Sequence, residues 1–356
     1  MRIGEREVGP GQPAFVVAEA GINHNSDSGI AQRMVKEAAK AGADAFKVQV
    51  FRSKDFCSPR ATWSYQDHAV ADFVTEPQAD MFARYELSDK LLALIKKACD
   101  DHGLILFGTP ATLEDADRLS AVGADPCFKV GSDDLTNTPL IRGLTKRGKP
   151  IILSTGMASW EDTKRALEAA GVDCDPFSGP TFSGPAVAML HWVSSYPTPT
   201  GMANLRRMKE LSRYASLVGY SDHTDGITAA PAAVALGASI IEKHFTVDRN
   251  MRGPDQRFSA DPKMFAAMVN AIRETEAMLG TGAVEPSVEE EAMRVTARRS
   301  IVAGGHLSAG TVLREDMIAY KRPGDGLMPY EQDSVLGRTL KRELQADDQI
   351  RLEDVE

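Results

Sequence analysis

The stretch Gly42-Ala43-Asp44-Ala45-Phe46-Lys47-Val48-Gln49-Val50 contains the pattern that decides the fold. A Gly-Ala pair ends an amphipathic segment there, and glycine suits a helix C-cap because it adopts a positive φ without steric cost. Residues 45–50 then alternate, with Lys47 and Gln49 on one face and apolar side chains on the other. The stretch therefore predicts the end of a helix followed by a buried strand.

The same pattern recurs along the first 280 residues, with further Gly-Ala pairs at 123–124 and 237–238. Apolar runs predict strands at residues 14–19, 45–50, 104–107, 127–130, 151–154, 187–191, 217–220 and 239–244. A period near 3.6 predicts helices at residues 29–41, 88–102, 113–121, 139–147, 160–170, 205–214, 227–236 and 263–279. Eight strand–helix units predict an α/β fold, a (β/α)8 TIM barrel, whose chemistry lies at the C-terminal ends of the strands. An open doubly wound sheet is the alternative, but the chain has no GxGxxG turn.

Composition excludes several classes of protein. The chain has 356 residues and a formal net charge of −9. Its apolar fraction of 43% is too high for a chain that is disordered throughout. No stretch is long and apolar enough to cross a bilayer, and the first residues lack the apolar core of a secretory signal. The acidic balance argues against a nucleic-acid binder. Four cysteines without CxxC spacing indicate thiols in a reducing cytoplasm, so we expect a cytoplasmic protein.

Three parts of the chain differ in composition and sequence pattern. Residues 1–280 form the predicted barrel domain, residues 281–297 are polar and Glu-rich and are interpreted as a linker, and residues 298–356 are a small β-rich module. Two insertions interrupt the barrel, at residues 52–87 and 171–185. The first is long enough to be a lid, because long ordered loops are usually functional.

Two predicted strands carry an inward lysine. Lys47 lies on the polar face of its strand, and Lys129 precedes a Gly-Ser turn at Ser132. The next strand ends at Ser154, ahead of another glycine turn. Ammonium, hydroxyl and backbone N–H groups together bind anions. These strand ends therefore predict an anion pocket. The alternative for Lys47 is a structural ion pair with an internal carboxylate.

Two more predicted strands end in histidine. His223 and His244 follow adjacent strands of the expected barrel, and Glu19 lies on the first strand. Imidazoles with a nearby carboxylate and open water positions suit Mn²⁺, Fe²⁺ or Mg²⁺ better than a closed zinc site. The alternative is that both are ordinary core histidines.

Seven motifs in chain order closely resemble those of sialic acid (N-acetylneuraminate) synthases. They are residues 18–25 (AEAGINHN), 42–49 (GADAFKVQ), 154–157 (STGM), 196–199 (YPTP), 219–224 (GYSDHT), 242–246 (EKHFT) and 253–255 (GPD). Residues 321–324 (KRPG) resemble the hallmark of the antifreeze-like (SAF) module that these enzymes carry at the C-terminus. The resemblance thus covers the whole chain.

The resemblance implies a transferase that condenses phosphoenolpyruvate with N-acetylmannosamine or a close analogue, giving a nonulosonic acid and phosphate. It implies a divalent cation, commonly Mn²⁺ with Mg²⁺ or Co²⁺ as alternatives, held by His223 and His244. Phosphoenolpyruvate would be held by Lys47, Thr109, Lys129, Ser132, Ser154 and Ser221, and the sugar by Gln49, Tyr196 and Asp255. Glu19 would stabilise positive charge at C2 of phosphoenolpyruvate or orient the water that adds there. The resemblance also implies a domain-swapped homodimer in which Arg322 reaches the partner's barrel.

Two positions depart from the family pattern near the substrates. Ser194 stands where the family usually has Asn, and Asp134 stands where it usually has Glu. Legionaminic acid synthases, which use a 2,4-diacetamido-2,4,6-trideoxymannose, share most of the motifs, whereas pseudaminic acid synthases usually lack two of them.

Two hypotheses from outside this family of synthases stay open. The first is an aldolase of the 3-deoxy-octulosonate phosphate type, which shares the barrel but should lack the C-terminal module. The second is a non-enzymatic carbohydrate-binding protein in which the barrel is an inert scaffold. The module at residues 298–356 argues against the first, and the lysines and histidines at the predicted strand ends argue against the second.

Overall fold

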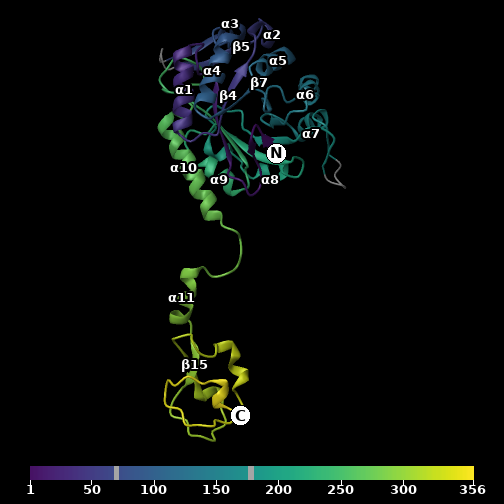
Figure 1. Cartoon of the computed structure of the whole chain (residues 1–356). Helices are drawn as coiled ribbons and strands as arrows, with labels where there is room; N and C mark the ends of the chain where they lie inside the picture. The colour runs from purple at the N-terminus through teal and green to yellow at the C-terminus, as the bar shows by residue number, and fades with distance from the viewer. Residues whose placement is uncertain (68–71, 175–179) are drawn as a thin grey trace. The chain divides into compact units, whose positions relative to one another are not determined.

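The computed structural model describes residues 1–67, 72–174 and 180–356. The described residues divide into two compact units, Met1–Gly280 and Thr281–Glu356. In the first unit, eight parallel strands close into a barrel in the order β12-β13-β14-β3-β4-β7-β8-β9, with helices around it (Figure 1). The strands are β3 (Phe15–Gly21), β4 (Ala45–Val50), β7 (Ile105–Pro110), β8 (Phe128–Val130), β9 (Ile151–Ser154), β12 (Val187–His191), β13 (Leu217–Asp222) and β14 (Ile240–His244). The predicted TIM barrel is confirmed.

Eight helices alternate with these strands and cover the outside of the barrel. They are α1 (Ser28–Lys40), α4 (Asp89–Asp101), α5 (Leu113–Ala121), α6 (Thr138–Thr145), α7 (Trp160–Ala169), α8 (Arg207–Leu211), α9 (Ala229–Ala235) and α10 (Pro262–Leu279). Their starts follow ordinary capping rules: Ser88 caps α4, and Ser159 forms a capping box on α7. Each helix begins or ends within three residues of its predicted bounds.

The alternation along each strand divides the apolar core into two. Phe46, Val48 and Val50 of β4 pack outward with the helices. Ala45 of the same strand packs inside the barrel, so Lys47 and Gln49 share its inward face. A short N-terminal hairpin, β1 (Arg2–Ile3) and β2 (Arg6–Glu7), adds Ile3 to the inner cluster. The predicted inward direction of Lys47 is therefore confirmed.

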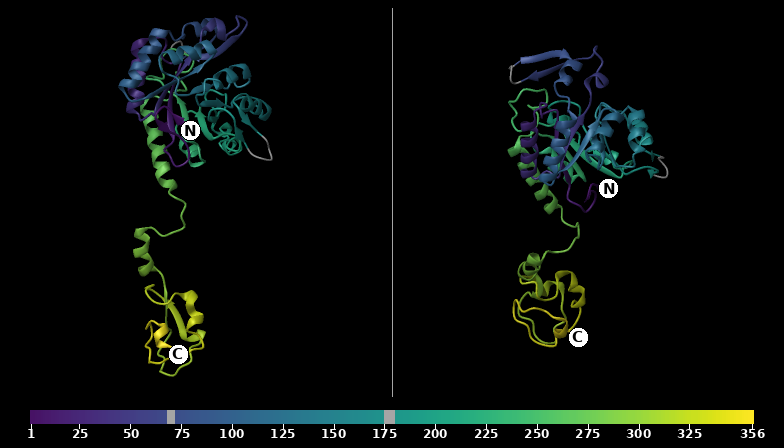
Figure 2. Two further views of the ribbon diagram at one scale, coloured as in Figure 1. Left: turned by 45° about the vertical axis from the view of Figure 1, so that its right-hand side comes forward. Right: turned by 45° about the horizontal axis from the view of Figure 1, so that its top comes forward.

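The insertion after β4 has a structure of its own. It contains α2 (Ser53–Phe56), the antiparallel hairpin β5 (Thr62–Asp67) and β6 (Asp72–Pro77), and α3 (Gln78–Ala83). Figure 2 shows the hairpin, in blue, at one end of the barrel. Tyr65 of the hairpin packs in a satellite apolar cluster with Met81 and Tyr85. Residues 68–71 of this predicted lid lie outside the described residues.

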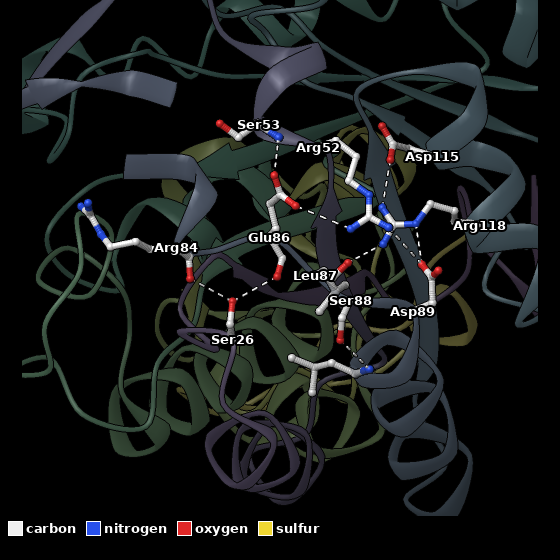
Figure 3. Close-up of polar contacts among 11 residues, drawn as sticks. Ser26, Arg52, Ser53, Arg84, Glu86, Leu87, Ser88, Asp89, Asp115 and Arg118 are labelled. Carbon is white, nitrogen blue, oxygen red and sulfur yellow. Dashed lines mark hydrogen bonds and ion pairs between the residues drawn. The ribbon is translucent and has the colours of Figure 1, made fainter. Parts of the chain in front are cut away.

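Polar contacts join the two ends of the insertion to each other and to the barrel (Figure 3). The backbone N–H of Ser53 donates to Glu86 Oε1 at 2.7 Å, and Arg52 Nη1 lies 3.5 Å from Glu86 Oε2. The Arg118 guanidinium of α5 pairs with Asp89 and Asp115 at 2.6 and 3.0 Å and donates to the Leu87 carbonyl. These contacts fix the base of the insertion.

The second insertion and the second unit complete the chain. Two short strands, β10 (Val172–Asp173) and β11 (Thr181–Phe182), pair within the second insertion, whose residues 175–179 lie outside the described part. The second unit has its own apolar cluster and an antiparallel pair, β15 (Ser300–Ala303) with β16 (Ile318–Lys321). The helix α11 (Val288–Ala297) occupies most of the stretch interpreted from sequence as a linker. No helix among the described residues is both long and apolar enough to cross a membrane.

Candidate active site

A layer of charged side chains lies inside the barrel at the C-terminal ends of its strands. We call Glu19 (β3), Lys47 (β4), Lys129 (β8) and Glu242 (β14) the charged layer; all four are buried. Lys47 Nζ pairs with Glu19 and lies 3.5 Å from Glu242 Oε2, while Lys129 Nζ lies 4.0 Å from Glu242 Oε1. The two lysines thus share the carboxylate of Glu242.

Burial sets the charge of this layer. It raises the pKa of Glu19 to about 7 and lowers the pKa of Lys129 to about 8. Burial also disfavours the charged forms of Lys47 and Glu242, but their opposite-charge neighbours prevail, so the pKa of Lys47 is raised and that of Glu242 is lowered. Burial thus favours the uncharged form of Glu19, which weakens the compensation of the two ammonium groups. A bound anion would restore that compensation.

His223 and His244 meet beside the charged layer, as predicted from the adjacent ends of β13 and β14. Their ring centroids lie 5.2 Å apart, both side chains are buried, and Nδ1 of each ring has no hydrogen-bond partner among the described residues. Burial lowers the pKa of His244 to about 3 and that of His223 well below its usual value. Both rings are therefore neutral near pH 7, the form that binds metals.

Backbone geometry at Gly21 brings Glu19 close to His244. Gly21 adopts a φ of +52° after a register shift in β3, and a Cβ there would lie 3.2 Å from Glu19 Oε1 and 3.4 Å from His244 Nδ1. The orphaned nitrogens fit a divalent cation held by the two histidines. No cluster of three or more His, Cys, Asp or Glu suited to a metal occurs in the part of the chain that the structure describes, so the remaining positions would be filled by water or substrate.

A buried ion pair braces the two strand ends that carry the histidines. Lys243 Nζ lies 2.7 Å from Asp222 Oδ2 and donates to the Thr224 carbonyl at 2.9 Å. Asp222 Oδ1 in turn accepts from the backbone N–H and the hydroxyl of Thr224, at 2.9 and 2.7 Å. Because Asp222 precedes His223 and Lys243 precedes His244, this pair fixes the backbone of both.

Hydroxyl groups surround the backbone of Gly156. Its N–H donates to Ser132 Oγ at 2.9 Å, and a Cβ at this position would lie 2.5 Å from Ser194 Oγ and 2.6 Å from Ser132 Oγ. The hydroxyls of Ser154 and Ser194 are buried and have no partner within residues 1–67, 72–174 and 180–356. A side chain at this position would displace both hydroxyls, and the unused hydroxyls form a cradle suited to an anion.

A cavity of about 970 Å³ opens beside these groups. The predicted site residues that line it from the barrel include Gln49, Ser132, Asp134, Ser194, Tyr196 and Asp255. The insertion contributes the apolar side chains Phe56, Trp63, Met81 and Phe82, which we call the insertion wall, together with Asp55, Cys57, Ser64, Tyr65 and Gln78. The predicted lid thus lines the site with an apolar wall and with polar side chains beside it.

The loop that carries Asp255 is held by the turn after β3. Asn23 Nδ2 donates to Phe245 O at 2.9 Å and Ser259 Oγ at 2.8 Å, and Gln256 Nε2 donates to the Asn23 carbonyl at 3.1 Å. Burial raises the pKa of Asp255 to about 7. A carboxyl group of this kind suits hydrogen bonding to sugar hydroxyls.

The remaining predicted residues fall into three groups. Thr109 Oγ1 accepts from Lys47 Nζ at 3.1 Å, and Ser221 Oγ donates to Glu242 at 2.8 Å, so both support the charged layer. Asn137 Nδ2 donates to Asp134 Oδ1 at 3.0 Å. Arg322 lies in the second unit, where its side chain is exposed and makes no hydrogen bond or ion pair with any described residue.

Sequence reasoning misses two residues of this site. Glu242, within the motif at 242–246, is not among the predicted site residues. It lies two residues after Ile240, which packs inside the barrel, so strand alternation directs Glu242 inward as well. Trp192 lines the cavity and stacks on His223. Its signal is an aromatic residue directly after the strand end at His191, which a search for charged groups does not detect.

Comparisons with known proteins agree with this geometry. The model of the NeuB family matches residues 34–284, and the model of the SAF domain matches residues 298–356. The chain is 41% identical to "Uncharacterized protein MJ1065" of Methanocaldococcus jannaschii, over 100% of this chain and 98% of that protein. It is 36% identical to N,N'-diacetyllegionaminic acid synthase of Campylobacter jejuni, over 95% and 98%. A solved structure of N-acetylneuraminic acid synthetase from Leptospira borgpetersenii, in complex with citrate, matches with a TM-score of 0.72 and 32% identity, over 82% of this chain and 94% of that one.

Proposed function

This chain belongs to the NeuB family, and from that premise we propose that it condenses phosphoenolpyruvate with an N-acylated hexose to give a nonulosonic acid and phosphate. The observation that carries the proposal is the convergence of two buried lysines and two neutral histidines beside one cavity. The lysines suit the phosphate and carboxylate of phosphoenolpyruvate. Both lysines pair with carboxylates of the charged layer, and a bound anion would be a further partner for their charge.

The residues of the site divide the work of this reaction. Lys47 and Lys129 bind phosphoenolpyruvate and stabilise the phosphate as its bond to C2 breaks. A divalent cation, Mn²⁺ in preference to Mg²⁺ or Co²⁺, held by His223 and His244 would supply Lewis acidity to the sugar carbonyl. The Glu19 carboxyl group and the His244 ring both lie beside Gly21. Glu19 orients the water that adds at C2 of phosphoenolpyruvate.

The hydroxyl cradle and the polar side of the cavity bind the rest of both substrates. Ser132, Ser154 and Ser221 complete the phosphoenolpyruvate site, with Thr109 holding Lys47 in place. Gln49, Tyr196 and Asp255 bind the sugar hydroxyl and acyl groups. Ser194 and Asp134 line the cavity beside them, and their short side chains leave room for a larger substituent.

The leading acceptor is N-acetylmannosamine or a close analogue. The insertion wall favours a second candidate, 2,4-diacetamido-2,4,6-trideoxymannose. That sugar carries a second acetyl group and a methyl group where N-acetylmannosamine has hydroxyls. Burying hydroxyls against apolar side chains costs free energy, whereas each buried methyl group contributes about 0.8 kcal/mol. The likeness to the Campylobacter jejuni enzyme supports the same candidate.

We further propose that the chain works in the cytoplasm as a domain-swapped homodimer in which Arg322 completes the partner's sugar site. The exposed guanidinium of Arg322 is suited to sugar and acyl oxygens, and the four cysteines are free thiols. The test mixes two inactive variants, His223→Ala and Arg322→Ala, after native mass spectrometry has confirmed subunit exchange. In a swapped heterodimer one site receives neither defect, so up to about half of its sites regain activity. Complete exchange without recovery contradicts this arrangement.

Phosphate release tests the reaction itself. Purified protein with Mn²⁺ and phosphoenolpyruvate should release phosphate only when an N-acylated mannose is added, and a chelator should stop the release reversibly. An octulosonate-type aldolase would instead require a phosphorylated sugar. A carbohydrate-binding protein would release no phosphate with any sugar.

A further inference from the structure

Trp192 occupies a central place in the site that neither the motifs nor the proposed chemistry explains. It follows the last residue of β12, and its side chain lines the cavity. The indole Nε1 is buried, and the side chain that it interacts with is that of Tyr196. The indole ring makes two further contacts.

The first of these contacts is with His223. The two rings stack with their centroids 4.5 Å apart and their planes 22° apart. Tyr196 meets His223 edge-on at 4.8 Å, and the backbone N–H of Thr198 donates to the His223 carbonyl at 2.8 Å. Since Nδ1 of His223 has no partner in the described part of the chain, contacts with neighbouring rings set the plane of this ring, and the stacked indole lies nearer than Tyr196 or His244.

The second contact is with Lys129. Its Nζ lies 5.3 Å from the centroid of the Trp192 ring, within the range of a cation–π interaction. The other partners of this ammonium are the Val130 carbonyl at 3.2 Å and Glu242 at 4.0 Å. One indole thus touches both a histidine of the cation site and a lysine of the phosphate site.

We propose that Trp192 is a positioning residue that couples these two sites, fixing the ring plane of His223 by stacking and holding the Lys129 ammonium against its face. The inference rests on the proposed function for the roles of His223 and Lys129. It concerns the indole ring and not its N–H group. Phenylalanine, which keeps a ring face, should therefore replace tryptophan better than leucine.

The test compares Trp192→Phe and Trp192→Leu with the matched control Trp160→Leu. Trp160 packs on Tyr214 at 4.2 Å and does not line the cavity. Mn²⁺ affinity is measured by electron paramagnetic resonance without substrates, and phosphoenolpyruvate affinity by calorimetry. Trp192→Leu should weaken Mn²⁺ binding about tenfold and phosphoenolpyruvate binding about two- to fivefold. Trp192→Phe should stay within about threefold of the parent in both, and Trp160→Leu should change neither.

A second measurement leaves Trp192 intact, so it tests the inference even if the Trp192→Leu protein does not fold. The chain has three tryptophans, so Trp63→Phe with Trp160→Phe leaves Trp192 as the single emitter. Paramagnetic Mn²⁺ should quench its fluorescence saturably, and His223→Ala in this background should abolish the quenching.

The outcomes separate this inference from the proposed function. Wild-type protein that binds no Mn²⁺ overturns the cation site and the inference together. Mn²⁺ that binds without quenching Trp192 overturns the inference alone. So does a folded Trp192→Leu protein with unchanged Mn²⁺ affinity, or a Trp192→Phe protein as impaired as the leucine variant.

Discussion

The charged layer and the insertion wall belong to one site but are built in opposite ways. Lys47 and Lys129 of the charged layer are buried on strands of the closed barrel, where every ionic partner is fixed by strand register. Trp63 of the insertion wall is 41% exposed, and it lies on a hairpin whose two strands, among the described residues, pair only with each other. Buried charges on rigid strands suit chemistry, whereas an exposed apolar surface on an insertion suits the choice of substrate. If this division is correct, variants of the two regions should affect different kinetic parameters.

The largest effect is expected from the histidines beside the charged layer. His223→Ala or His244→Ala should lower kcat/KM at least about 1,000-fold, because Lewis-acid activation of the sugar carbonyl is worth several kcal/mol. The melting temperature, measured by calorimetry in the absence of metal, should stay close to that of the parent. Near-normal turnover in chelator-treated enzyme would contradict the two-histidine cation site.

The next effect is expected within the charged layer itself. Lys129→Met should raise KM for phosphoenolpyruvate about 30- to 150-fold, because one charge-assisted contact to phosphate is worth about 2–3 kcal/mol. KM for the sugar should change far less. Lys146→Met, at an exposed position after α6, is the matched control and should leave both constants unchanged. Equal increases for both substrates would mean that Lys129 has only a structural role.

A smaller effect, on the other substrate, is expected from the insertion wall. Trp63→Ala should lower kcat/KM for the sugar about 5- to 30-fold, since burying this aromatic surface against a ligand is worth about 1–2 kcal/mol. KM for phosphoenolpyruvate should not change. Trp160→Ala is the control, because Trp160 is 42% exposed, against 41% for Trp63, and lies outside the cavity. The division of roles fails if Trp63→Ala impairs phosphoenolpyruvate instead.

The smallest effect is expected at the base of the insertion. Glu86→Gln keeps an oxygen for the Ser53 N–H but removes the charge that faces Arg52. A half-exposed pair of this kind is worth less than about 1 kcal/mol. Backbone amides of the hairpin should exchange with solvent a few times faster, and KM for the sugar should rise about two- to threefold. Unchanged exchange would show that this contact does not restrain the insertion.

The same two regions show what sequence reasoning reaches. Every barrel strand is predictable, because period-2 alternation and glycine-capped helices are local signals that the closed sheet reinforces. The inward direction of Lys47 follows from that alternation. The insertion is predictable only as a lid, since β5 and β6 are exposed and polar on one face and acquire their register from each other.

Contacts across the barrel are beyond local patterns. Glu242 and Trp192 act through partners on other strands, namely the two lysines and His223. The helix α11 is not predicted from the sequence because its residues are nearly all exposed, so the helix has no buried stripe. Its local signal is the capping box at Ser287. Strand order predicts that neighbouring strand ends meet, as at His223 and His244, but local spacing does not show which side chains make contact across the barrel.

Product analysis in a competition between two sugars tests the central claim most directly. The protein is incubated with Mn²⁺, phosphoenolpyruvate and equal amounts of N-acetylmannosamine and 2,4-diacetamido-2,4,6-trideoxymannose, and the products are identified by mass spectrometry. We predict a nonulosonic acid that contains all the carbons of one sugar plus three from phosphoenolpyruvate, formed with one phosphate per product. The ratio of the two acids should shift towards N-acetylneuraminate in Trp63→Ala. Phosphate release without any carbon–carbon bonded product, or no reaction with either sugar, would contradict the account.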